Sequence, residues 1–64
     1  MMQENFWVGN TEYIIRYRNG THELLEIEQV NYDEYKTEII ATGTYEHCRK
    51  IVEEARIEYL ESLF

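Results

Sequence analysis

The side chains that most often carry catalysis are scarce in this chain. It contains two histidines, His22 and His47, and a single cysteine, Cys48. A nucleophile and its base must lie within hydrogen-bonding reach, whereas His47 and Cys48 are adjacent, and adjacent side chains on a helix point about 100° apart. We therefore expect Cys48 to be a small core residue and His47 to be a surface residue. We predict that the protein is not an enzyme and has no catalytic residues.

Metal and cofactor sites are not predicted either. The sequence has no zinc-type histidine or cysteine spacing, no EF-hand pattern and no glycine-rich phosphate loop. Four glutamates do fall within the C-terminal segment, but such a cluster is typical of a solvated helix face, and a carboxylate dimetal site would also need histidines on neighbouring helices. These glutamates are Glu53, Glu54, Glu58 and Glu61.

Acidic side chains are the most abundant chemical feature, with 13 Asp and Glu against 6 Lys and Arg and a net charge of −7. The excess lies between residues 21 and 43, where six carboxylates face Lys36 alone, a net charge of −5. This balance disfavours direct binding to nucleic acid or acidic lipid and favours a basic protein partner, although the charge would also serve solubility alone. The predicted contact set is Glu26, Glu28, Asp33, Glu34 and Glu38.

Carboxylates spaced along a strand and a loop, near Tyr32 and Tyr35, can imitate the phosphates of a nucleic-acid backbone. The basic groove of a nucleic-acid enzyme would attract such a surface by long-range steering. Very small acidic proteins without catalytic equipment include many inhibitors of this class, notably phage-encoded blockers of bacterial nucleases. By this analogy of class, the leading hypothesis is an anti-defence inhibitor or regulator that occupies a basic surface of its partner.

The elements that position these residues follow from hydrophobic periodicity. Alternating runs between glycine and asparagine predict strands at about 5–8, 11–18, 22–30 and 35–42. A helix is predicted over about 44–63, because an apolar stripe recurs at three- and four-residue steps behind a possible N-cap at Thr44. We expect one α+β domain over residues 1–64, a four-stranded antiparallel meander (ββββα) with the helix packed on one sheet face.

The hairpin at Asn19-Gly20 poses a conflict between turn chemistry and hydrophobic pattern. A two-residue loop is the strongest local signal, but it would place Leu25 and Ile27 on the face opposite Ile15 and its tyrosine neighbours. A one-residue shift reverses every side chain of a strand. We therefore predict a β-bulge in or near this hairpin, with Leu25 and Ile27 facing the helix.

This assignment leaves an apolar strip with a charged rim on the outward sheet face, a combination typical of an interface. Its predicted members are Trp7, Ile14, Arg16, Leu24 and Ile40. The alternative function is therefore a homo-oligomeric binding module, a dimer joined through this face. In a third hypothesis the protein sequesters a small molecule or nucleotide between protomers, through the cationic side chains of Arg16, Arg18 and Arg49.

The end of the helix carries Ile57, Leu60 and Phe64 off the main apolar stripe. We expect them to pack over the sheet edge and Phe6, with pairing to another chain as the alternative. No run of about 18 apolar residues is present, and no signal peptide is expected. Because a lone cysteine suits a reducing compartment, we expect a cytoplasmic location. Self-association is an expected aid to stability in a chain of 64 residues.

Overall fold

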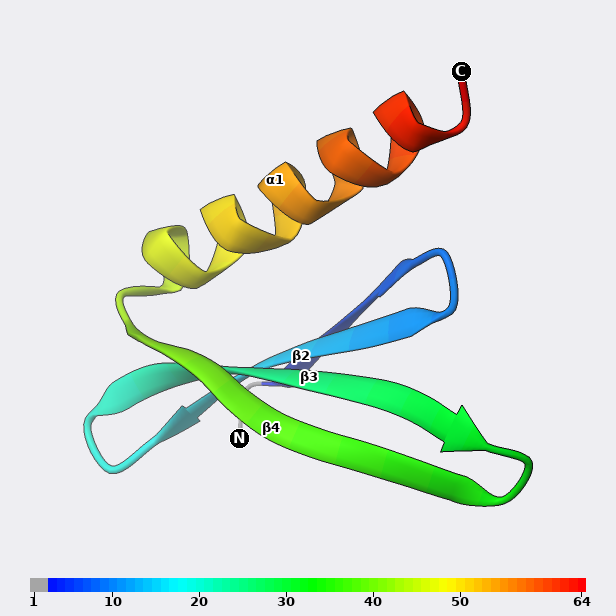
Figure 1. Ribbon diagram of the computed structural model, residues 1–64. Coiled ribbons are helices and arrows are strands. Elements are labelled where there is room, and N and C mark those ends of the chain that lie inside the picture. Colours follow the sequence, from blue (N-terminus) through cyan, green and yellow to red (C-terminus); the bar gives the residue numbers. More distant parts are fainter. Residues whose placement is uncertain (1–2) are drawn as a thin grey trace.

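Alternation of apolar and polar residues produces four strands, as predicted. The computed structural model describes residues 3–64, in which β1 (Gln3–Val8), β2 (Thr11–Arg18), β3 (Thr21–Asn31) and β4 (Glu34–Gly43) form one antiparallel sheet in the order β1-β2-β3-β4. A single helix, α1 (Tyr45–Ser62), follows β4 and crosses one face of the sheet (Figure 1). The predicted α+β architecture, ββββα, is confirmed.

The β2–β3 hairpin closes with a two-residue turn. Asn19 and Gly20 have φ angles of 54° and 79°, which is the positive pair that a type I′ turn requires. From Arg18, opposite Thr21, the register then runs without interruption along the whole of β2. We predicted a bulge in or near this hairpin. The hairpin itself has none, because the turn chemistry alone sets its register, and the nearest bulge lies beside Leu24 and Leu25 in the pairing of β3 with β4.

This register decides which of two adjacent leucines enters the core. Ile15 lies opposite Leu24, which is completely buried beneath the helix, whereas Ile14 lies opposite Leu25. Leu25 and Ile27 therefore occupy the sheet face away from the helix. The prediction that Leu25 and Ile27 face the helix, and that Leu24 faces outward, is wrong. With leucine at both 24 and 25, either register buries an apolar side chain, so the turn decides between them.

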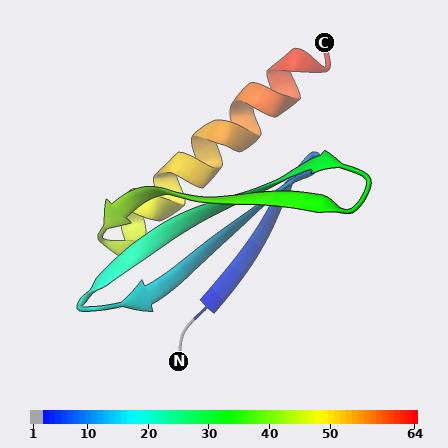
Figure 2. The ribbon, with the colours of Figure 1, turned by 60° about the horizontal axis from the view of Figure 1, so that its bottom comes forward.

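The irregularities occur instead in the β3–β4 hairpin. Leu24 pairs with Ala41 and Leu25 with Ile39, so Ile40 is an extra residue in β4. A second shift in the pairing makes Val30 an extra residue in β3. Bulges bend a strand and increase its twist. The far part of this hairpin, residues 26–38, stands apart from the helix in both ribbon views (Figures 1 and 2). We call residues 26–38 the β3–β4 arm.

The core lies between α1 and the near half of the sheet. Thr44 caps the helix as predicted, because its Oγ1 accepts a hydrogen bond of 3.0 Å from the His47 amide. Burial raises the pKa of the Cys48 thiol and thus disfavours a reactive thiolate, which agrees with the predicted core role of Cys48. The residues buried in this core are Val8, Tyr13, Ile15, Leu24, Cys48 and Val52.

The C-terminal part of α1 extends past the packed region. Ile57, Leu60 and Phe64 are 54%, 48% and 104% exposed, so the predicted packing of these side chains over Phe6 is wrong. The Phe6 ring is covered instead by Arg49, whose guanidinium lies 4.5 Å from the ring centroid. The helical stripe makes its last contact through Tyr59, which lies against the β1–β2 turn at Gly9. Over residues 3–64, no helix has the length and apolar character needed to cross a membrane.

Candidate functional site

The two histidines lie on different elements, β3 and α1, and serve local structure. The His22 ring packs edge-on between Tyr17 and Tyr45, at centroid distances of 5.1 and 5.8 Å. His47 lies in the first turn of α1, where its ring is close to Gly43. Within residues 3–64 no group of three or more histidine, cysteine or acidic side chains is arranged to hold a metal ion. The notable surfaces of the described chain are therefore the acidic arm and the uncovered sheet face.

Three of the five predicted contact residues lie on one face of the β3–β4 arm. Glu26 pairs directly with Glu38, and Glu28 pairs with Lys36. Because alternate residues share a face, Glu26 and Glu28 lie on the same side of β3 as Leu24, which is the helix side. The sheet therefore separates them from Arg16, which lies on the opposite face. Glu26 is half-buried, whereas Glu28 and Glu38 are exposed.

The pairing of Glu26 with Glu38 is electrostatically unfavourable. Directly opposed residues of an antiparallel pair have Cβ atoms about 4.5–5.5 Å apart, and like charges there are destabilising. Lys36 offsets this weakly, since its Nζ lies 3.6 Å from Glu38 Oε1 and both side chains are more than half exposed. The fold therefore tolerates a like-charge pair in a position where a neutral pair would be more stable.

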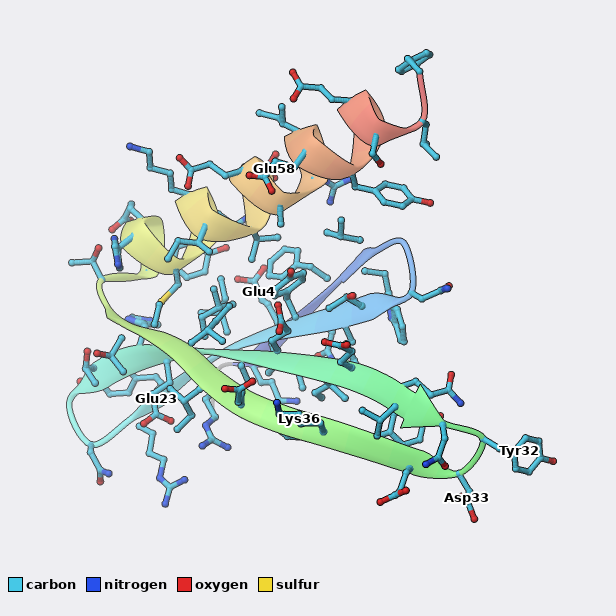
Figure 3. The ribbon with its side chains drawn as sticks, in the orientation of Figure 1. Glu4, Glu23, Tyr32, Asp33, Lys36 and Glu58 are labelled. Atoms are coloured by element: carbon cyan, nitrogen blue, oxygen red, sulfur yellow. The ribbon has the colours of Figure 1, made fainter. Side chains whose placement is uncertain are left out.

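Tyr13 connects the acidic residues to the core. Its hydroxyl donates a hydrogen bond of 3.1 Å to Glu26 Oε2. Burial raises the pKa of Tyr13, and the Glu26 hydrogen bond and the charges of Glu26, Glu28 and Glu58 raise it further. Glu58 comes from α1 (Figure 3), so carboxylates from two elements act on the same hydroxyl.

These carboxylates, together with Glu38 and Lys36 of β4, form a surface that we call the acidic face. Four carboxylates and one ammonium group give it a net charge of −3. Its members are Glu26, Glu28, Lys36, Glu38 and Glu58.

The other two predicted contact residues, Asp33 and Glu34, lie at the tip of the arm. The tip is ordered by two hydrogen bonds, from Asn31 Nδ2 to Glu34 Oε1 at 2.6 Å and from Gln29 Nε2 to the Tyr32 carbonyl at 3.2 Å. The Tyr32 side chain stands out at the end of the arm beside Asp33 (Figure 3) and is 94% exposed. The arm thus presents an aromatic ring beside carboxylates, with its backbone held in place.

The sheet face away from the helix, which we call the outer face, carries an apolar row across three strands. Ile14, Leu25 and Ile39 are cross-strand neighbours, and the next row contains Trp7 and Ile27. Leu25 is only 7% exposed because its neighbours surround it, whereas Trp7 and Ile39 are 62% and 51% exposed. The prediction of Leu24 for this face is wrong, because Leu24 lies in the core. Ile40, also predicted for this face, is the extra residue of the bulge in β4.

The charges of the outer face are balanced, in contrast to those of the acidic face. Arg16 Nε donates to Glu23 Oε1 at 2.8 Å, and the Glu12 carboxylate accepts a 2.6 Å bond from Asn5 Nδ2. With Arg18, the face holds two guanidinium groups and two carboxylates, a net charge of zero. Glu23 can be seen on the side of the sheet away from the helix (Figure 3).

The three arginines predicted to hold a small anion do not converge. Arg16 and Arg18 lie on the outer face, whereas Arg49 lies over Phe6 on the helix side and forms an ion pair with Glu53. In a single chain, the sheet therefore separates these cationic groups, and they form no common site.

Some residues of these surfaces were absent from the sequence-based sets. Leu25 and Ile27 on the outer face would have been found by accepting the Asn-Gly turn rule for the hairpin, whereas Ile39 reaches this face only because of the bulge at Ile40. Glu58 would not, because its position depends on how α1 crosses the sheet. Comparison of the chain with protein-family models, curated proteins and solved structures finds no significant match.

Proposed function

We propose that this protein is a non-enzymatic inhibitor or regulator that binds a basic surface of a partner protein through its β3–β4 arm. The observation that carries the proposal is the direct pairing of Glu26 with Glu38 at the base of the arm, where Glu38 is exposed and Glu26 is half-buried. A like-charge pair lowers stability. Glu26 accepts a hydrogen bond from the core residue Tyr13, but Glu38 is exposed and lies outside the core. A cationic side chain of a partner would offset that repulsion, so binding would remove an unfavourable interaction that the free protein retains.

The arrangement of the arm suits a groove that normally holds nucleic acid. Glu26 and Glu28 are alternate residues of β3, about 6.6 Å apart along the strand, with Glu38 beside them and Asp33 and Glu34 beyond. Such a series of carboxylates can replace successive phosphates against lysine and arginine side chains. Tyr32 at the tip adds an aromatic contact of the kind that often contributes strongly to binding.

The partner class that we propose is a nucleic-acid-binding protein, and by analogy with small acidic phage inhibitors, a bacterial defence nuclease. Competition with the nucleic acid would then account for inhibition without any chemistry by the inhibitor. We place this activity in the cytoplasm, where the free thiol of Cys48 would remain reduced.

Salt dependence and competition test this proposal together. The immobilised protein is incubated with bacterial extract at low salt, bound proteins are eluted as salt rises, and each candidate is purified and titrated against the protein. We expect affinity to fall steeply with ionic strength and nucleic acid to displace the protein. Affinity that is unchanged by salt, or a complex that binds nucleic acid as well as the free partner does, would contradict the proposal.

A further inference from the structure

The isolated chain exposes more surface than its mass predicts. Its accessible surface is 4892 Å², whereas a compact monomer of 7.8 kDa exposes about 4400 Å². Its radius of gyration is 12.3 Å, against about 10.7 Å for a compact chain of this length. The shortest dimension is 16 Å, because the sheet is covered on one face only. The outer face is therefore uncovered in the single chain.

The uncovered outer face carries an apolar patch. Ile14, Leu25 and Ile39 form a continuous row over β2, β3 and β4, and Trp7 and Ile27 extend it. An uncovered, contiguous apolar patch of this kind marks an interaction site. Four strands about 4.8 Å apart and seven residues about 3.3 Å apart give the patch a projected area of about 400 Å². Two such patches in contact bury about 800 Å², which is below the size of standard specific interfaces and suits a weak contact that forms as concentration rises.

The charge balance of the outer face favours a second copy of the chain as its occupant. Two chains that each carry −7 repel one another, and the acidic face and arm tip are poorly suited to self-contact. The outer face is the neutral alternative, and it is also complementary to itself. A two-fold axis in the interface plane, running between β2 and β3, places β2 of one copy over β3 of the other. Arg16 then approaches Glu23 of the second copy, and Ile14 approaches its Leu25.

We infer that the protein forms a homodimer in which the outer faces of two copies pack together, with the helices and the acidic faces directed away from the interface. The closed two-fold contact buries the same patch on both copies. The resulting arrangement of layers is helix, sheet, sheet and helix. This inference does not rest on the proposed function, because it concerns the opposite face of the sheet and would hold for any partner.

Matched isoleucine substitutions test the interface. Ile39 on the outer face and Ile57 on α1 are 51% and 54% exposed, so Ile39→Lys and Ile57→Lys alter net charge equally at similarly exposed positions. Sedimentation from about 1 μM to about 1 mM should give a mass approaching twice 7.8 kDa for the wild type and for Ile57→Lys. Ile39→Lys should raise the dissociation constant by at least about tenfold, because two ammonium groups enter an apolar interface.

The single tryptophan gives an independent measurement on the unmodified chain. Trp7 is 62% exposed in one copy and lies on the proposed interface, so its emission should shift to shorter wavelength as concentration rises. This shift keeps the inference testable if Ile39→Lys fails to fold. A wild type that remains monomeric to about 1 mM would overturn the inference. So would dimers that Ile57→Lys disrupts and Ile39→Lys does not, because the contact would then be the exposed end of the helix.

Discussion

Substitution of the two adjacent leucines provides a quantitative test of the observed strand register. Leu24 is fully buried beneath α1, whereas Leu25 lies on the outer face of the sheet, which no helix covers. Leu24→Ala removes apolar carbons worth about 2.4 kcal/mol in transfer free energy and leaves a cavity enclosed by Val52 and Cys48. The total loss in unfolding free energy should be about 3–4 kcal/mol.

Leu25→Ala should cost about 1–2 kcal/mol in the monomer. The same carbons are removed, but the space opens toward solvent and leaves no enclosed cavity. A chain of this length has a total stability of about 3–10 kcal/mol, so both losses are measurable by urea denaturation followed by circular dichroism at low protein concentration. If Leu24→Ala leaves no folded baseline, the milder pair Leu24→Val and Leu25→Val should keep the same order. A greater loss at Leu25 than at Leu24 would refute the register and restore the bulged hairpin.

Three further predictions address the acidic pair, the glycine turns and the buried tyrosine. Glu38→Gln should raise the unfolding free energy by about 0.2–1 kcal/mol, and a decrease would show that the like-charge pair is not a cost. Gly20→Ala should lower the unfolding free energy by about 1 kcal/mol, because its φ is 79°. Gly9→Ala should lower it further, because a Cβ there would lie 2.7 Å from Tyr59. In a double-mutant cycle, Tyr59→Ala should remove this additional loss. The raised pKa of Tyr13 implies stability that is full below pH 10.0 and is lost as pH rises above it; in denaturation series, Tyr13→Phe should flatten this loss, and an unchanged profile would contradict it.

The strands and the helix were predictable because local signals agreed. Thr44 marked the helix start, and the stripe through Cys48 and Val52 marked its buried side, so the helix was recovered with its cap. In the hairpin the local signals disagreed. Two positive-φ residues at Asn19 and Gly20 fix the register within one turn, and this constraint prevailed over the pattern of later apolar positions.

The bulge in β4 and the neighbours of α1 depended on tertiary geometry. The bulge at Ile40 falls in a run of β-branched residues without a glycine or proline to mark it. The direction in which α1 crosses the sheet determines that Ile57 remains exposed and that Glu58 acts on Tyr13. Neither follows from periodicity, because periodicity specifies the buried side of an element and not the neighbours that it meets.

The proposed function is tested most directly by comparing two charge-matched variants in binding to a purified partner. Glu28→Gln/Glu38→Gln removes two carboxylates from the acidic face, and Glu54→Gln/Glu61→Gln removes two exposed carboxylates from α1, so both variants change the net charge from −7 to −5. At low salt we expect the first variant to lose about 1–2 kcal/mol of binding free energy, or about 5- to 30-fold in affinity. The helix variant should stay within about twofold of the wild type. Equal losses in the two variants would mean that only net charge matters, and would contradict a binding site on the arm.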